Sequence, residues 1–202
     1  IFHASTSEVY GDPKEFPQKE TYLGNVNPNG VRSCYDEGKR AAESIFMDYY
    51  RTRCIKIKIA RIFNVYGPKM RSDDGRLISN LVIQALKNQP MTIYGDGSQT
   101  RSLCYIDDLL DGILKLMDTP DDVTGPVNLG NPDERSVLEI AGIIKDITQS
   151  KSPIEFRPLP QDDPKRRCPD ISLASSILNW KPNVDLRTGI AKTVDYYRIE
   201  LC

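Results

Sequence analysis

Residues 55–64 of the chain are Ile55-Lys56-Ile57-Lys58-Ile59-Ala60-Arg61-Ile62-Phe63-Asn64. The first half alternates isoleucine with lysine, and this period of two is typical of a β-strand. A second strand-like segment, 1–7, and a helical pattern from Tyr35 to about Thr52 precede it. The order strand, helix, strand favours an α/β fold with a parallel sheet.

The alternation of strand and helix patterns continues along the chain. Helices are predicted at 77–86, 107–117, 136–148, 172–180 and 185–201, and short strands at 91–94, 126–129 and 154–157. Ser136 and Glu139 have the spacing of a capping box. The apolar side of the helix at 107–117 is expected to comprise Leu109, Leu110, Ile113, Leu114 and Met117. The segments 11–30 and 158–169 are rich in turn formers and are expected to be loops.

Composition narrows the classes of function. Of the 202 residues, 39% are hydrophobic and 27% charged, which predicts a packed globular core. Lys and Arg number 27 and Asp and Glu 28, so no general positive field favours nucleic acid. No apolar run approaches the roughly 18 residues of a membrane helix. The five cysteines form no C-x-x-C pair and His3 is the one histidine, so neither a disulfide framework nor a zinc site is expected.

The chain begins within a strand pattern, without an initiator methionine or a targeting signal. We therefore expect it to be the carboxy-terminal part of a longer protein, whose amino-terminal part holds more of the same sheet.

Two groups of residues suggest a site for chemistry. Thr6, Ser7 and Glu8 end the first strand, and ligands of open α/β sheets bind at the carboxyl ends of strands. Tyr35 and Lys39 lie four apart at the start of a helix and so share one face. A phenol is a weak base at neutral pH, but a nearby ammonium stabilises the phenolate. Such a phenolate can take the proton of a sugar hydroxyl while hydride passes to NAD, with Thr6 holding the reacting oxygen.

Each group also has an ordinary structural interpretation. The spacing Tyr-x-x-x-Lys recurs at Tyr10 and Lys14, in a turn where the side chains need not meet. Tyr35 and Lys39 on their own would equally suit an exposed surface pair. Residues 6–8 would suit a strand end with a helix-capping role.

Three segments taken together narrow the choice of protein family. They are Ser5-Thr6-Ser7-Glu8-Val9-Tyr10-Gly11, Tyr35-x-x-x-Lys39 and Arg61-Ile62-Phe63-Asn64-x-Tyr66-Gly67-Pro68. In this combination the chain resembles the nucleotide-sugar branch of the extended short-chain dehydrogenase/reductase family over essentially its whole length. Members of the family carry a Gly-rich NAD loop, and none of the thirteen glycines here forms one, so that loop is expected in the amino-terminal part.

The resemblance implies the carboxy-terminal part of a Rossmann-like, doubly wound parallel sheet with a small substrate-binding lobe. About 1–65 and 103–132 would belong mainly to the Rossmann-like part, and about 66–102 and 133–202 mainly to the lobe. It also implies a homodimer whose interface includes the helix of Tyr35. Bacterial relatives are cytoplasmic, which is the location expected here, whereas animal relatives are anchored in the Golgi membrane.

Within the branch, the chain resembles the UDP-glucuronate decarboxylase subfamily. The 4,6-dehydratases carry Asp where Ser7 stands here, whereas Thr-Ser-Glu is the decarboxylase pattern. Arg167-Cys168-Pro169-Asp170-Ile171 is similar to an Arg-Lys-Pro-Asp-Ile segment, with Cys168 in place of Lys. The segments 74–76, 97–101 and 128–132 match too. The activity implied is NAD-dependent conversion of UDP-glucuronate to UDP-xylose, by C4 oxidation, loss of carbon dioxide and C4 re-reduction.

The resemblance also implies roles for individual residues. The catalytic residues would be Tyr35, Lys39, Thr6, Glu8, Ser7 and Arg167. The cofactor-binding residues would be Ala4, Ser5, Thr6, Tyr35, Lys39, Val65, Arg71 and Arg76. The UDP-sugar would contact Asn64, Arg76, Tyr94, Gln99, Arg101 and Tyr49. Without the resemblance, Arg76, Arg101 and Arg167 would be surface charges, and Tyr49 would suit a core or a dimer interface.

Other functions stay open at this point. A 4-epimerase or a 4,6-dehydratase would use the same scaffold, although Ser7 and Arg167 argue against both. A related decarboxylase stops at the 4-keto pentose. A non-catalytic sugar-nucleotide-binding protein is the alternative of a different class.

Overall fold

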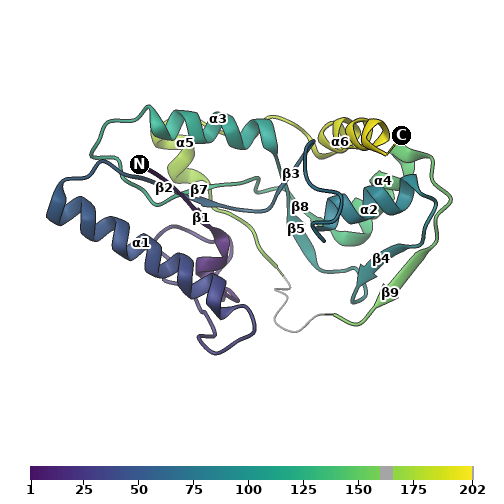
Figure 1. Ribbon diagram of the computed structural model, residues 1–202, viewed down its shortest axis with the longest axis horizontal. Helices are drawn as coiled ribbons and strands as arrows, with labels where there is room; N and C mark the ends of the chain where they lie inside the picture. The colour runs from purple at the N-terminus through teal and green to yellow at the C-terminus, as the bar shows by residue number, and fades with distance from the viewer. Residues whose placement is uncertain (160–165, 202) are drawn as a thin grey trace.

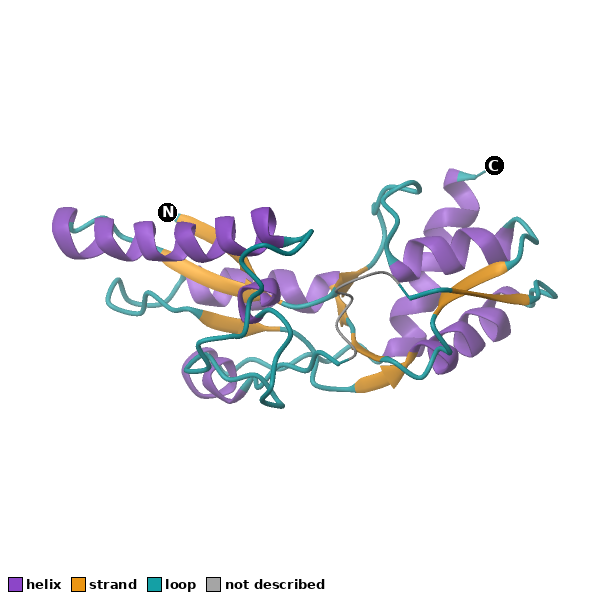
Figure 2. Cartoon of the chain, turned by 90° about the horizontal axis from the view of Figure 1, so that it is seen from below, coloured by secondary structure: helices purple, strands orange, loops and turns teal. Residues whose placement is uncertain are grey.

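A three-stranded parallel sheet forms the end of the molecule where the chain begins (Figure 1). The structure is a computed structural model that describes residues 1–159 and 166–201. The strands are β1 (Phe2–Thr6), β2 (Lys58–Ile62) and β7 (Val127–Leu129), in the order β1-β2-β7. Helix α1 (Ser33–Arg53) lies on one face, and α3 (Ile106–Met117) and α5 (Ser172–Leu178) lie on the other (Figure 2). Helices on both faces confirm the predicted α/β class.

The middle strand β2 is buried on both faces. Ile59 and Ala60 are fully buried, and Lys58 is only 7% exposed. The Lys58 ammonium donates to the carbonyl oxygens of Thr119, Pro120 and Val123 and to the Thr119 hydroxyl. Burial lowers the pKa of Lys58, and these four acceptors replace the water that the ammonium has lost. The lysine thus ties the loop before β7 to the centre of the sheet.

The predicted apolar side of α3 is only partly correct. Leu109 is buried, but Leu110, Leu114 and Met117 are 49%, 63% and 50% exposed. The buried face runs instead through Leu109, Gly112 and Leu116. At Gly112 an added Cβ would lie 2.9 Å from the Trp180 ring, so the absence of a side chain lets the helix approach that ring. Leucine content indicated the helix but not which side faces the sheet.

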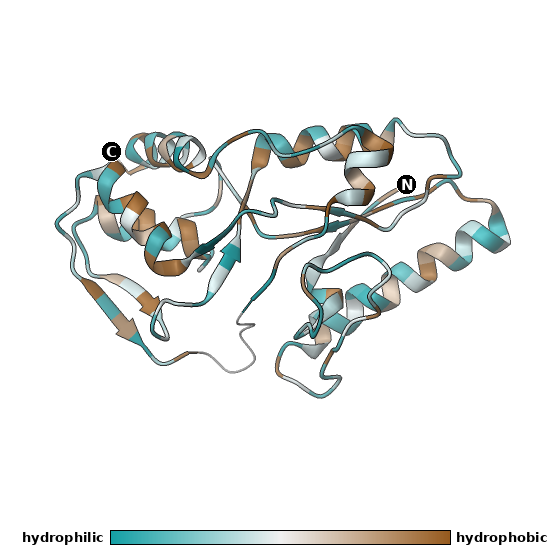
Figure 3. Ribbon diagram, turned by 180° about the vertical axis from the view of Figure 1, so that it is seen from behind, coloured by the Kyte–Doolittle hydropathy of each residue, from teal (hydrophilic) through white to brown (hydrophobic). Residues whose placement is uncertain are grey.

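The other end of the molecule has its own hydrophobic core. Helices α2 (Leu77–Leu86), α4 (Val137–Thr148) and α6 (Leu186–Glu200) surround it, together with the parallel pair β4 (Met91–Tyr94) and β9 (Ile154–Arg157). Ser136 and Glu139 form the predicted capping box at the start of α4. Apolar residues dominate α2 and α4, whereas α1 is mixed (Figure 3).

Short strands join the two ends. β3 (Val65–Tyr66) pairs with β6 (Cys104–Tyr105), and β5 (Thr100–Ser102) pairs with β8 (Glu134–Ser136). None of these four was predicted. Helix α5 packs on the three-stranded sheet, where Ala174 and Leu178 share a core with β7. Helix α5 therefore belongs to the first core, whereas α4 and α6 belong to the second.

Helix α1 is held to the sheet mainly by polar contacts. Asp36 is its one buried residue among those that the structure describes. Lys39 donates to the Ala4 carbonyl oxygen at 2.8 Å, and Arg40 donates to the carbonyl oxygens of Val9 and Leu23. The half-buried Phe46 ring lies 4.7 Å from the His3 ring. These contacts tie the helix to β1 and to the turn-rich segment that follows it.

Arg61 on β2 completes this attachment. Its guanidinium makes two hydrogen bonds to the Glu43 carboxylate of α1, at 3.0 and 2.7 Å, and others to the Tyr10 hydroxyl and the Glu20 carbonyl. Burial would lower the pKa of Arg61, but the hydrogen bonds to Glu43 outweigh it and raise the pKa overall. The guanidinium therefore stays charged, and the two side chains of the pair are only 13% and 12% exposed.

We predict that Arg61→Met lowers the free energy of unfolding by about 3–5 kcal/mol, because it leaves the Glu43 carboxylate largely buried without its partner. Urea titration followed by circular dichroism measures the change. Lys56→Met is the control, since Lys56 pairs with Asp121 at an exposed site and its removal should have no measurable effect. Equal losses in the two variants would contradict the role assigned to Arg61.

Candidate active site

The carboxyl end of β1 turns directly into the 3-10 helix η1 (Ser7–Tyr10). The Thr6 hydroxyl accepts a hydrogen bond from the Glu8 backbone N–H at 3.2 Å, which is the capping role left open by the sequence. Ser5, Thr6 and Ser7 are nearly buried, at 3%, 8% and 2% exposure. The turn leaves the Glu8 side chain at the edge of the sheet where ligands of α/β folds bind.

The first turns of α1 bring Tyr35 and Lys39 to the same edge. The Lys39 ammonium lies 5.9 Å from the centre of the Tyr35 ring, as the predicted shared face requires. Lys39 is fixed by its hydrogen bond to Ala4, whereas the Tyr35 side chain is 48% exposed and free to meet a ligand. The hydrogen bond to β1 thus keeps the Lys39 ammonium near the Tyr35 ring.

The second Tyr-x-x-x-Lys copy has a structural role. Tyr10 is 1% exposed, and its hydroxyl donates to Asn128 on β7 at 2.7 Å. Burial raises the pKa of Tyr10, so the phenol stays neutral. Lys14 is exposed on the loop. The same spacing therefore gives a hydrogen bond in the core at one place and an accessible pair at the other.

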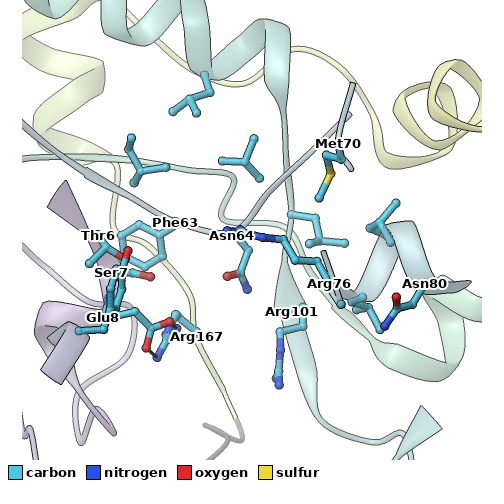
Figure 4. A pocket seen from close by; sticks show the side chains of 18 of the residues that line it. Thr6, Ser7, Glu8, Phe63, Asn64, Met70, Arg76, Asn80, Arg101 and Arg167 are labelled. Carbon is cyan, nitrogen blue, oxygen red and sulfur yellow. Dashed lines mark hydrogen bonds and ion pairs between the residues drawn. The ribbon is translucent and has the colours of Figure 1, made fainter. Parts of the chain in front are cut away.

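The Glu8 carboxylate is held between two guanidinium groups. Arg167 makes a bidentate ion pair with it, and Arg32 lies 3.1 Å from Glu8 Oε2 on the other side. Arg167 is 5% exposed, so it is no surface charge, unlike its neighbour Arg166, which pairs with Glu134. The Glu8 and Arg167 side chains meet at the wall of the cleft (Figure 4). Two cations against one carboxylate leave a local excess of positive charge.

The opposite wall comes from the second core. Asn64 lies between the two walls, and Arg76 and Arg101 lie on the far side (Figure 4). Gln99 donates to the Tyr94 carbonyl oxygen, which fixes the Gly95–Ser98 turn, and Arg101 donates to the Thr100 carbonyl oxygen. The space between the walls, here called the main cleft, is about 830 Å³. That is the size of a pocket for a whole small-molecule ligand.

Most of the predicted site residues line the main cleft. They are Ala4, Ser5, Thr6, Ser7, Glu8, Tyr35, Lys39, Asn64, Val65, Arg76, Tyr94, Gln99, Arg101 and Arg167. Two are not brought there. Arg71 pairs with Asp73 on an exposed loop, and Tyr49 lies near the far end of α1, 49% exposed.

Sequence reasoning missed several lining residues, among them Arg32, Phe63, Met70 and Asn80. Arg32 could have been found, because it precedes Tyr35 by three residues at the start of the same helix. The others carry no local signal. Among the residues that the structure describes, no group of three or more His, Cys, Asp and Glu could hold a metal ion.

Comparison with known proteins places this geometry among sugar-nucleotide enzymes. The model of the NAD dependent epimerase/dehydratase family matches residues 1–130. UDP-glucuronic acid decarboxylase 1 of Arabidopsis thaliana is 55% identical over 96% of the chain and 44% of its own length. UDP-glucuronic acid decarboxylase 1 of Danio rerio is 50% identical over 98% of the chain and 47% of its own length. The chain thus spans about half the length of these curated relatives.

Solved structures agree on the fold. The chain resembles a UDP-glucuronic acid 4-epimerase of Bacillus cereus, solved with UDP-glucuronic acid and NAD, with a TM-score of 0.89 and 33% identity over 98% of the chain and 61% of that protein. A UDP-glucose 4-epimerase of Thermotoga maritima, solved with UDP-glucose, gives a TM-score of 0.92 and 26% identity over 100% of the chain and 64% of that protein.

Proposed function

The chain belongs to the NAD dependent epimerase/dehydratase family, and we propose that it forms part of an enzyme that decarboxylates UDP-glucuronate to UDP-xylose with NAD as cofactor. The observation that carries the proposal is the Glu8 carboxylate between Arg32 and Arg167, beside Tyr35 and Lys39. Tyr35 and Lys39 can accept the proton of an alcohol, and the adjoining arginines can bind a carboxylate.

The first step assigned to this chain is removal of the proton from the C4 hydroxyl. Tyr35 takes it, and the Lys39 ammonium stabilises the resulting phenolate. Thr6, with Ser7 beside it, holds the C4 oxygen, since Thr6 reaches the cleft while its hydroxyl also caps η1. Bound NAD would supply the acceptor for the C4 hydride and the donor for its return.

The residues present fit one end of that cofactor. Ala4, Ser5 and Val65 line the main cleft with the tyrosine and lysine, whereas Arg76 lies on the opposite wall and Arg71 lies outside the cleft. No Gly-rich phosphate loop occurs in the sequence, so this chain offers no cradle of that kind for the diphosphate of NAD. The residues of this chain therefore fit the end of NAD that exchanges the hydride.

The second step is loss of carbon dioxide. A C4 ketone makes the sugar a β-keto acid, and the electron pair of the broken C5–C6 bond passes into the enolate of that ketone. Arg167 and Arg32 suit the approach of the C6 carboxylate by their charge. Glu8 keeps Arg167 in one orientation and repels the carboxylate, which favours its departure as neutral carbon dioxide. After carbon dioxide has left, Glu8 takes up a proton and transfers it to C5.

The UDP portion is assigned to the opposite wall. Arg101 and Arg76 would bind the diphosphate, because a guanidinium can hold two phosphate oxygens at once. Asn64, Tyr94 and Gln99 would contact the uridine and the sugar. A wall of this kind binds any UDP-sugar, so the choice of reaction depends on the Glu8 side.

A 4-epimerase is the second candidate, favoured by the likeness to the UDP-glucuronic acid 4-epimerase of Bacillus cereus. The two reactions share the C4 oxidation and differ in the fate of the carboxylate. The Arg167–Glu8 pair, with Arg32 beside it, supports decarboxylation, because Glu8 and two cations would adjoin the C6 carboxylate of a bound substrate.

We also propose that two copies associate through α1. Ile45 and Tyr49, four apart on its outer face, are 56% and 49% exposed. This apolar strip, on a helix anchored by its polar side, would be buried against the second copy. As for location, the residues that the structure describes contain no helix able to cross a membrane. The four described cysteines are free, and a reducing, cytoplasmic compartment remains our proposal.

We predict that the natural polypeptide containing this chain forms carbon dioxide and a UDP-pentose in equal amounts from UDP-glucuronate. Tyr35→Phe should lower kcat by about 10²–10⁴-fold, because the general base is lost. Tyr50→Phe, on the same helix, is the control and should leave kcat unchanged. A UDP-hexuronate product would instead establish the epimerase, a 4-keto pentose the truncated reaction, and no turnover a binding protein.

Replacing Arg167 by Ala should reduce carbon dioxide release by about 100-fold or more, since a buried cation that meets the reacting carboxylate is lost. Binding of UDP, measured by calorimetry, should stay within about tenfold because the opposite wall is intact. Arg187→Ala, at an exposed pair with Asp146, is the matched control. Normal carbon dioxide release in Arg167→Ala would overturn the role assigned to this arginine.

For the dimer, Ile45→Glu should shift the molar mass in light scattering from two copies to one, because it places a charge in the apolar strip. Ile199→Glu, at a still more exposed position on α6, should leave the mass unchanged. A dimer that survives Ile45→Glu would locate the interface elsewhere.

A further inference from the structure

The proposed reaction needs one proton from solvent in each turnover. The proton that Tyr35 takes from the C4 hydroxyl returns to that oxygen when C4 is reduced again. The carboxylate leaves as neutral carbon dioxide, and the electron pair left at C5 must bond to a new proton. The net change is therefore a carboxylate and a proton converted to carbon dioxide and a C–H bond. With the main cleft filled by its ligands, this proton needs another path.

A second cavity adjoins the site from behind the Glu8 pair. Its volume is about 660 Å³, and it is lined by the turn-rich segment between Gly11 and Gly30 and by the start of α1. Glu8, Arg32 and Arg167 line both this second cavity and the main cleft. The three side chains therefore form a shared wall, with the substrate position on one side and a separate space on the other.

Asp36 faces the second cavity. Tyr35 lines the main cleft and not the second cavity, and Asp36 lines the second cavity and not the main cleft, although the two are consecutive on α1. Asp36 is 7% exposed, and its Oδ1 is buried without a hydrogen-bond partner among the described residues. Leaving a buried carboxylate oxygen without a partner is costly. Burial first, and the charge of Glu8 second, raise the pKa of Asp36.

We propose that Asp36 is a proton-relay residue, which transfers protons from water in the second cavity to Glu8. This proposal rests on the proposed function, and each proton that is used is replaced. The Glu8 carboxylate takes a proton from the Asp36 carboxyl group through cavity water and gives it to C5, which leaves Glu8 a carboxylate again. Asp36 is then protonated again from solvent. Arg32 and Arg167 hold Glu8 in place between the two spaces.

A purely structural role for Asp36 would have a different signature. An acid in the first turn of a helix stabilises that turn through the helix dipole. Loss of such an interaction lowers stability but does not separate the two products in time. Relay and structure are therefore distinguished by the order in which carbon dioxide and pentose appear.

The test uses Asp36→Asn in the natural polypeptide that contains this chain, with rapid-quench measurement of both products from UDP-glucuronate. In the unchanged protein carbon dioxide and pentose should appear together. In Asp36→Asn, carbon dioxide should appear first, as a burst of one per site, and pentose formation should slow by about tenfold or more because its proton supply is impaired. The KM for UDP-glucuronate should not change. Asp36→Glu, which keeps a carboxyl group, should again form carbon dioxide and pentose at the same rate.

Asp48→Asn, an exposed acid on the same helix, is the control and should behave like the unchanged protein. Ser33→Phe provides a second variant, since Ser33 lines the second cavity and a ring there should obstruct it and produce the same burst. Simultaneous products at the normal rate in Asp36→Asn would overturn the relay while leaving the proposed function intact. Absence of carbon dioxide and pentose in the unchanged protein would overturn both.

Discussion

The ion pair between Arg61 and Glu43 is the interaction on which the geometry of the site depends. Helix α1 carries Tyr35 and Lys39, yet it packs few apolar side chains against the sheet. Hydrophobic contact has no fixed direction, so a helix attached by apolar packing alone could slide or rotate. A bidentate guanidinium–carboxylate pair has a defined geometry. The pair therefore determines where the first turn of α1 lies relative to the end of β1.

Each side of α1 contacts a different part of the molecule. Lys39 and Glu43, four residues apart, attach it to β1 and β2. Tyr35 and Asp36 lie at its start, where Tyr35 lines the main cleft and Asp36 lines the second cavity. Ile45 and Tyr49 remain on the outer surface. Because successive residues of a helix are about 100° apart, one segment can present an attachment, a site and an outer strip at once.

The charged side chains at the site come from distant parts of the sequence. Glu8 and Arg167 are 159 residues apart, and Arg32 reaches the same carboxylate from the start of α1. Burial of Arg167 is tolerated because its charge is paired. The pairing also keeps the acid oriented for reaction, so stability and chemistry depend on the same contact. Arg166, one residue earlier, has an exposed pair and no such constraint.

The sequence by itself determined the features that depend on neighbouring residues. The bounds of α2, the capping box at Ser136 and the shared face of Tyr35 and Lys39 follow from spacing along one element. The strand pattern of residues 1–7 likewise indicated the sheet edge at Thr6 and Glu8. Such features need no knowledge of distant contacts, because the backbone period alone decides them.

Only the tertiary structure decided which side chains are buried and which charges meet. Lys58 is polar but lies inside the sheet, while Leu114 is apolar but 63% exposed. Strands of two or three residues, such as β3 and β5, are too short to show a period. The contact of Arg32 with Glu8 and the unpaired oxygen of Asp36 depend on loops packing against α1. Burial and ion pairing are relations between segments far apart in the chain, and no local pattern specifies them.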